Sequence, residues 1–310
     1  MSPIKRFLLL LALTAMWSPS FLFIKLAVHD LPPLTIAASR IAIASIILYG
    51  IVRWKGYNFP KDWQFWFHAS MMGLFSSCFP FCLFCYAEGT INSSLAAVLN
   101  GTTPMFTALL AHLFVPSDRL SLTKTVGISL SLGGLVFLFA PYLLENGLNG
   151  SAYGMLAAAV ASFCYSVGHI YGKKYYMGHK PFVGPTASLI ASAVFLWPFA
   201  AYYESPLSLP FPSAEALIGI AGLALLGTVI AFVLYFKLLE ECGPTAVSLV
   251  ACFFPVGGML LGFIFLGETF TLGNLFAASL ILMGMMVVNK VIKIKSWETT
   301  AAVDHQPTTR

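Results

Sequence analysis

Apolar residues dominate this chain in long runs that are separated by short polar connections. A helix needs about 20 mostly apolar residues to cross the hydrocarbon core of a bilayer. The pattern predicts ten such helices, at residues 7–28, 34–52, 65–86, 94–115, 122–140, 153–171, 182–203, 214–238, 245–266 and 272–288. The connections leave no room for a separate soluble domain, so an all-α integral membrane fold is expected.

The composition supports a protein whose solvent is lipid. Hydrophobic residues make up 58% of the 310 residues, and charged residues only 9%, whereas soluble domains carry about 25% charged residues. Lys5 and Arg6 before an apolar run also resemble the start of a signal peptide. Because the run continues to residue 28 without a clear cleavage site, we interpret it as the first helix.

The positions of Lys and Arg predict the orientation, since these residues favour cytoplasmic loops. With a cytoplasmic N-terminus, all of the 17 Lys and Arg residues except Lys25 and Arg40 fall on the cytoplasmic side or in the tail. The expected location is therefore a bacterial inner membrane, crossed several times, with both termini in the cytoplasm. Residues 291–310 turn polar and are expected to form a disordered cytoplasmic tail.

The chain also repeats itself. The segments SSLAAVLNGTTP and PTAVSLVACFFP end at Pro104 and Pro255, which are 255 − 104 = 151 residues apart. We therefore predict two repeats, 6–143 and 151–290, with five helices each. An odd number of helices per repeat inverts the second repeat relative to the first. Inverted repeats underlie many secondary transporters, whose substrate site lies near the midplane between the halves.

These same segments resemble a known family. The stretch SLAAVLNGTTPMFTALLAHLF before Asp118, and the stretch TAVSLVACFFPVGGMLLGFIFLGE ending at Glu268, are similar to the EamA-type branch of the drug/metabolite transporter superfamily. The segment PPLTIAASRIAIASII, which contains Arg40, is similar to the second helix of that family. The resemblance covers about residues 6–290 and departs at Ser117-Asp118, where the pattern usually has Gly-Glu. It implies transport of metabolites or amino acids, often export, through a central cavity between two helical bundles.

Arg40 is the first candidate for substrate binding. It lies ~10 Å into the second predicted helix, and a charge at that depth usually faces a polar cavity or a partner. No Asp or Glu lies well inside a predicted helix, so a substrate carboxylate or phosphate would suit its guanidinium group. Alternatively, Arg40 bonds to backbone carbonyls, or reaches Glu88 or Asp30. Lys25 either extends its amine to the membrane–water interface or places a second positive charge at the mouth of the cavity, as a gating residue.

Other candidates come from the matched prolines and from side chains with polar tips. Pro104 and Pro255 interrupt helices in small or polar surroundings, which suits hinges. The predicted cavity-lining residues, apart from Arg40, are Trp17, Tyr86, Asn100, Tyr165, His169 and Tyr235. For each of them, hydrogen bonding or packing between helices is the alternative.

The function predicted from these features is secondary transport, with export favoured, of an amino acid or related carboxylate by alternating access. The alternatives are export of hydrophobic cations, a channel or a scaffold. No phosphate-binding loop or motif of an intramembrane enzyme is present, so we expect neither ATP hydrolysis nor an enzyme. We also expect no cofactor, metal or nucleic acid. The expected partners are a small-molecule substrate and the lipid bilayer, with a monomer favoured over a dimer.

Overall fold

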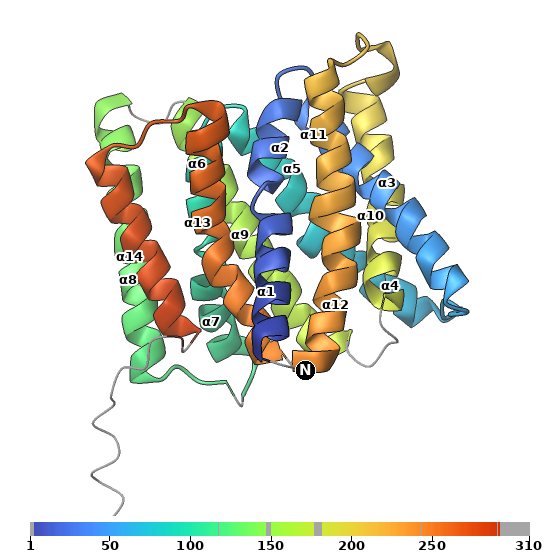
Figure 1. Cartoon of the computed structure of the whole chain (residues 1–310), viewed down its shortest axis with the longest axis horizontal. Coiled ribbons are helices and arrows are strands. Elements are labelled where there is room, and N and C mark those ends of the chain that lie inside the picture. The colour runs from blue at the N-terminus through green and yellow to red at the C-terminus, as the bar shows by residue number, and fades with distance from the viewer. Residues whose placement is uncertain are drawn as a thin grey trace, which may run out of the picture.

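A computed structural model of the chain describes residues 3–116, 118–146, 150–176, 182–242, 244–289 and 291. Every regular element in this part of the chain is helical, as predicted. In chain order the elements are α1 (Pro3–Trp17), α2 (Ser20–Ala27), α3 (Pro33–Trp54), α4 (Trp63–Gly73), η1 (Leu74–Cys78), α5 (Phe79–Glu88), α6 (Ser93–Asn100), α7 (Thr103–Phe114), α8 (Leu122–Asn146), α9 (Gly150–Tyr175), α10 (Val183–Tyr203), η2 (Pro206–Ser208), α11 (Ala214–Ala224), η3 (Leu225–Ile230), α12 (Ala231–Cys242), α13 (Pro244–Leu266) and α14 (Leu272–Val288). They run side by side between two ends of the molecule (Figure 1). The predicted tail, apart from Val291, lies outside the described residues.

Eight helical stretches among the described residues are long and apolar enough to cross a membrane, and they correspond to the first eight predicted segments. The last two predicted segments correspond to shorter apolar helices, Pro255–Leu266 and Leu272–Val288. At 1.5 Å per residue, the 17 residues of α14 extend about 26 Å, slightly less than the ~30 Å hydrocarbon core. The structure thus establishes eight candidate spans, and a ten-helix arrangement remains a prediction.

Two of the predicted continuous helices are interrupted. The first stops at Ser18 and Pro19, between α1 and α2. The fourth stops at Gly101 and Thr102, and Pro104 then lies in the first turn of α7, where its missing N–H is tolerated. Pro255 differs from this expectation, since α13 continues through it without a break. Of the two matched prolines, only Pro104 therefore marks an interruption in this structure.

Two other segments contain a π-helical turn in the middle. The turn η1 lies between α4 and α5, and η3 lies between α11 and α12. Their first residues, Leu74 and Leu225, are 225 − 74 = 151 residues apart, the same separation as the two prolines. Such turns appear frequently at functional sites, and η3 contacts one of the predicted site residues, as described below.

The two predicted repeats do not form separate bundles, because their helices pack in alternation. Helix α14 packs along α8, α10 along α3, α9 along α5, α11 along α2 and α13 along α6. Each of these pairs joins a helix before residue 147 to one after residue 149. In the last pair, Gly258 closely approaches Ala97 and Gly262 closely approaches Ser94. The Gly258–Gly262 spacing thus serves packing between two helices of one chain.

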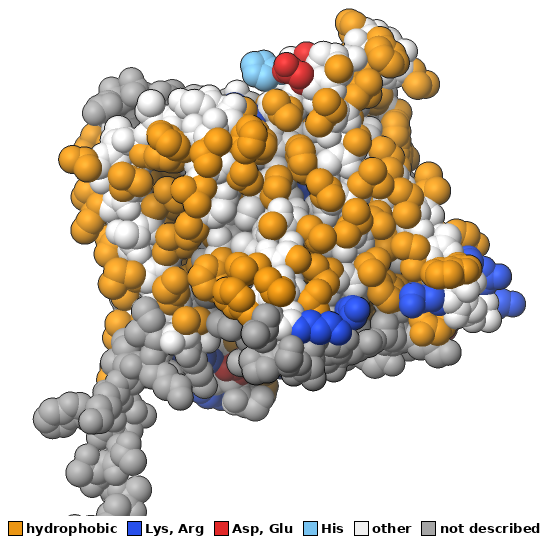
Figure 2. Space-filling model, in the orientation of Figure 1, with side chains coloured by type: hydrophobic (Ala, Val, Ile, Leu, Met, Phe, Trp, Pro, Cys, Tyr) orange, Lys and Arg blue, Asp and Glu red, His pale blue; other side chains and the backbone are white. Residues whose placement is uncertain are grey.

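The charged side chains differ between the two ends of the molecule. Figure 2 shows most of the visible Lys and Arg near the end that carries the N-terminus, which we call the basic end. The opposite end shows Asp, Glu and His. We call it the acidic end, because Asp30, Glu88, Glu204 and Glu268 belong to the helix ends and connections found there. The sides between the ends are largely covered by hydrophobic side chains in this view.

Candidate functional site

Arg40 lies inside the helix bundle, with only 7% of its surface exposed. Its Nε donates to Oγ1 of Thr228 at 3.1 Å and its Nη2 to the carbonyl of Gly227 at 3.5 Å, so both partners belong to η3. The guanidinium group also stacks on Phe81, 3.9 Å from the ring centre. Within the described residues, no carboxylate lies within 4.0 Å of it and no further hydrogen bond is formed.

The surroundings of Arg40 include one other predicted site residue. Tyr165 on α9 lies within electrostatic range of the guanidinium group and packs against Phe84, with the ring centres 6.1 Å apart. Tyr165 also contacts both of the larger apolar clusters of the bundle. Arg40, Tyr165, Phe81 and Thr228 therefore form a polar and aromatic group deep between helices of both halves, and we call it the arginine cluster.

The other predicted cavity residues do not join the arginine cluster. Trp17 and Tyr235 contact each other nearer the basic end, with ring centres 5.9 Å apart. Asn100 ends α6, and its Oδ1 accepts a hydrogen bond from Thr103. Tyr86 and His169 are exposed. That each of these residues lines a substrate cavity therefore remains a prediction.

Lys25 has partners at the acidic end. Its Nζ donates to the backbone carbonyls of Glu88 at 2.7 Å and Ile91 at 3.0 Å. The Glu88 carbonyl ends α5 and the Ile91 carbonyl lies three residues beyond it, where a cation also interacts favourably with the helix dipole. This contact fixes the loop after α5, and it was not foreseen from the sequence, because the acceptors are backbone atoms more than 60 residues away.

Three carboxylates join the halves of the molecule at the acidic end. Glu204 accepts from the backbone N–H groups of Leu34 at 2.9 Å and Thr35 at 2.6 Å, at the start of α3. Glu268 accepts from the N–H groups of Ser93 and Ser94 at the start of α6, and from the Ser94 hydroxyl. Asp30 accepts from the N–H of Ser213, the residue before α11.

Each of these carboxylates satisfies backbone donors that a helix start leaves open. We call the three contacts the acidic-end clasp. The bond from Ser213 also holds the pKa of the Asp30 carboxyl below its usual value. The sequence shows the acidic residues near helix ends, but it does not show which helix each one meets.

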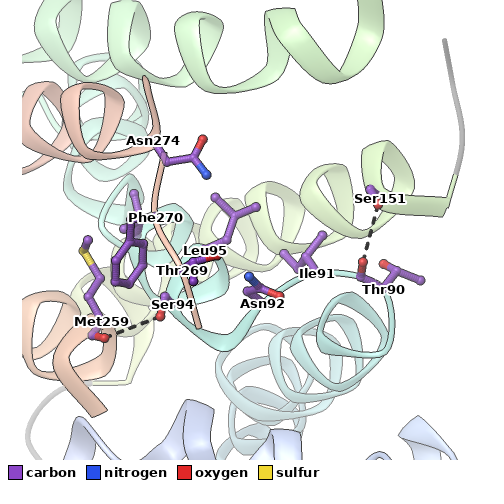
Figure 3. A pocket seen from close by; sticks show the side chains of 11 residues that line it. Thr90, Ile91, Asn92, Ser94, Leu95, Ser151, Met259, Thr269, Phe270 and Asn274 are labelled. Carbon is purple, nitrogen blue, oxygen red and sulfur yellow. Dashed lines mark hydrogen bonds between the residues drawn. The ribbon is translucent and has the colours of Figure 1, made fainter. Parts of the chain in front are cut away.

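A cavity of about 140 Å³ lies beside this clasp. Figure 3 shows Asn92, Ser94, Ser151, Thr269 and Asn274 around it, together with the apolar side chains of Leu95, Met259 and Phe270. The polar groups are hydroxyls and amides, and none of the described residues that line the cavity is charged. None of the predicted site residues lies in its wall. Its polar groups come from loops and helix starts, where the pattern of apolar segments predicts no site.

Comparison with known proteins identifies the family. A model described as the EamA-like transporter family matches residues 5–140 and 152–290. The chain belongs to the EamA-like transporter family. The resemblance noted in the sequence is thereby confirmed, and the two matched ranges each contain one of the paired segments that end in Pro104 and Pro255.

Relatives of this EamA-like chain are named as transporters. It is 26% identical over 280 residues to the "Uncharacterized inner membrane transporter YedA" of Escherichia coli (strain K12), covering 90% of this chain and 89% of that protein. It is 26% identical to the "Uncharacterized transporter YoaV" of Bacillus subtilis (strain 168), covering 92% and 96%. A "Probable amino-acid metabolite efflux pump" of Salmonella typhimurium is also 26% identical, covering 90% and 93%.

The fold of the EamA-like chain also matches a solved structure. A crystal structure with 19% identity superposes with a TM-score of 0.65 and covers 94% of this chain and 99% of that one. At this identity the match concerns the fold alone. The family, the apolar helices and the relative named as an inner membrane transporter together indicate a multi-pass membrane transporter. The relatives are transporters by name, which weighs against an enzymatic role.

Proposed function

We propose that this protein is a secondary transporter that exports a small metabolite with a carboxylate group, amino acids being the first class to test. The observation that carries the proposal is Arg40. A guanidinium group deep in an apolar bundle has two hydrogen-bond acceptors and no carboxylate partner among the described residues. Because arginine binds carboxylates through two parallel bonds, a substrate carboxylate could supply the missing counter-charge.

The proposed mechanism is alternating access between two inverted five-helix repeats. Support comes from the paired packing of α14 with α8, α10 with α3 and α13 with α6, which is the pattern expected for a pseudo-twofold axis. The two π-helical turns, separated by the same 151 residues as Pro104 and Pro255, fit the same axis. Substrate sites of inverted-repeat transporters lie near the midplane between the repeats, where the arginine cluster joins helices of both halves.

The proposed orientation places the basic end in the cytoplasm. Lys5, Arg53, Lys55 and Lys61 belong to this end, as do Lys173 and Lys174 of α9. Because positively charged loops are retained in the cytoplasm, the acidic end with its clasp and cavity then faces outward. The N-terminus and the segment after α14 are cytoplasmic in this arrangement, as the sequence predicts.

Purified protein in proteoliposomes tests the substrate class. We would measure counterflow of labelled amino acids and organic anions for the wild type, Arg40→Ala and Arg40→Lys. A hydrogen bond to a charged group contributes about 1.5–3 kcal/mol, so we expect binding of a carboxylate substrate to weaken roughly 10- to 100-fold in Arg40→Ala. Arg40→Lys should restore part of this loss, because it keeps the charge but not the paired geometry.

The matched control is Arg53→Ala, because Arg53 lies on the same helix but is exposed at the basic end, where it binds Asn58. It should transport like the wild type. If a correctly folded Arg40→Ala transports the same carboxylates with unchanged affinity, Arg40 only stabilises η3. If no amino acid or organic anion crosses the bilayer with the wild-type protein, the proposed substrate class is wrong.

A further inference from the structure

Glu88 has a carboxyl group that is buried inside the bundle. It is the last residue of α5, its side chain is 0% exposed, and neither carboxylate oxygen has a hydrogen-bond partner among the described residues. Burying a charged carboxylate without such partners is very costly, and the group usually takes up a proton instead. The sequence places Glu88 at a helix end, where exposure to water is expected, so only the packing reveals this property.

The neighbouring charges do not neutralise Glu88. Lys25, from α2, directs its Nζ to the carbonyls of residues 88 and 91 and lies more than 4.0 Å from the carboxylate. Glu268 lies within electrostatic range, but its own oxygens are occupied by the N–H groups that start α6. Two nearby carboxyl groups thus have opposite environments. Both oxygens of Glu268 accept hydrogen bonds, whereas those of Glu88 have no partner among the described residues.

Among the described residues, only Lys25 and Glu268 are charged side chains within electrostatic range of Glu88. Arg40 on α3 and Glu204 after α10 lie within electrostatic range of Cys85, one helical turn deeper than Glu88. Helix α6 contains no Asp, Glu, Lys or Arg, and the charged residues of α9, Lys173 and Lys174, lie in its last turn at the basic end. A small cation is disfavoured as an occupant because the Lys25 ammonium group is so near. The chemical class that fits is a proton.

We propose that Glu88 is a proton-binding site that is filled while the acidic end is closed and is emptied when that end opens. In the structure the clasp of Asp30, Glu204 and Glu268 joins helices of the two halves at this end, and we take this arrangement as the closed one. The cavity lined by Thr90 and Ile91 begins two residues beyond Glu88, so opening would bring water to the carboxyl group. The O–H proton then passes to water, and Lys25 stabilises the remaining anion.

This site would make opening of the acidic end depend on the pH of the outer water. The carboxyl group releases its proton to that water as the end opens and takes a proton back from it as the end closes, so the proton balance closes on one side of the membrane. That consequence rests on the proposed function, whereas the existence of the proton site does not. The infrared experiment below examines the site without any substrate, so its failure is distinguishable from failure of the transport proposal.

Infrared difference spectroscopy of the full-length protein in lipid detects the proton directly. At neutral pH the wild type should show the carbonyl stretch of a buried protonated carboxylic acid, and Glu88→Gln should lose it. The matched control is Glu215→Gln, which alters an exposed carboxylate at the start of α11 and should keep the band. Absence of the band in the wild type, or its persistence in Glu88→Gln, would overturn the proposal.

A second variant covers the case in which Glu88→Gln does not fold. Glu88→Asp keeps a carboxyl group at this site but moves it, because the side chain is shorter. The band should therefore remain but shift in frequency. An unshifted band would assign it to another group and refute the site. If Glu88→Asp also fails to fold, the wild-type protein alone provides the test. Its band should resist hydrogen exchange and should not titrate over the pH range in which exposed carboxyl groups ionise. A band that titrates together with exposed carboxyl groups would refute burial of the site.

The link to opening has its own test. Glu204→Ala removes the contact of the clasp at the start of α3 and should favour the open end. The wild-type band and the Glu204→Ala band would be titrated with pH. Because opening favours loss of the proton, the midpoint should move to lower pH in the variant. An unchanged midpoint, or a shift to higher pH, would show that the proton is not linked to opening.

Discussion

The contact between Glu268 and the start of α6 predicts a large difference between two acidic residues at matched positions. Glu268 and Asp118 are 268 − 118 = 150 residues apart and follow the paired segments of the two halves. Glu268 is buried and accepts hydrogen bonds from the other half. Asp118 forms ion pairs with Lys124 and Lys173, and its side chain is 38% exposed. Replacing each by alanine should therefore have unequal effects.

The magnitude follows from these contacts. Each hydrogen bond to a charged acceptor contributes about 1.5–3 kcal/mol, and loss of a helix N-cap alone costs about 0.5–2 kcal/mol. The bonds of Glu268 share one carboxylate and do not add independently, so we expect Glu268→Ala to lower the free energy of unfolding by about 3 kcal/mol. Exposed ion pairs contribute about 0–1 kcal/mol, and Asp118→Ala should lose no more than that.

Thermal unfolding in nanodiscs measures the difference. At one heating rate, Glu268→Ala should unfold on the order of 5 °C below the wild type, and Asp118→Ala within about 2 °C of it. Glu268→Gln should fall between them, since it keeps an acceptor oxygen but loses the charge. Equal shifts for the two alanine variants would refute the reasoning, because they would mean that the bonds at α6 contribute no more than an exposed ion pair.

Two further predictions concern the same end of the molecule. A methyl group at Gly262 would lie 2.5 Å from Oε2 of Glu268 and 3.0 Å from Oγ of Ser93, so Gly262→Ala should lower the unfolding temperature by a few degrees. The control Gly133→Ala, at a position with open space on α8, should not lower it. Equal shifts for the two variants would argue against close packing of α13 on α6. The Asp30 carboxyl has a lowered pKa because of Ser213, so its contribution to stability is present above the unfolded pKa and is lost as pH falls through the lower folded value. Wild type and Asp30→Asn should therefore differ fully in unfolding temperature above about pH 3.8 and converge only as the pH falls below the lowered folded pKa. A difference that grows with acidity would contradict this sign.

The sequence alone determined the membrane class, eight of the candidate spans and the family. Long apolar runs such as 34–52 and 182–203 correspond to α3 and α10, because an apolar segment of span length has few stable alternatives to a helix in lipid. The repeated segments around Pro104 and Pro255 carried the resemblance, and the matched family ranges agree with it. The functional conclusion that a transporter is present needed no coordinates.

Local pattern was less informative about interruptions within helices. Proline at 104 follows a break, but proline at 255 lies within continuous α13. The π-helical turns at Leu74 and Leu225 have no comparable marker in the sequence. Whether a helix breaks depends on which neighbouring groups satisfy the freed backbone atoms, and those neighbours come from distant parts of the chain.

Only the tertiary structure decided the partners of the charged residues. Arg40 binds η3, almost 190 residues later in the chain, and Glu268 binds the start of α6, about 175 residues earlier. Glu88 has the same residue type and a similar position near a helix end as Glu268, yet its carboxyl group is buried with no hydrogen-bond partner in the part of the chain that the structure describes. The free energy of a charge depends on the atoms within a few ångströms of it. In this protein those atoms are supplied by the alternating packing of the two halves.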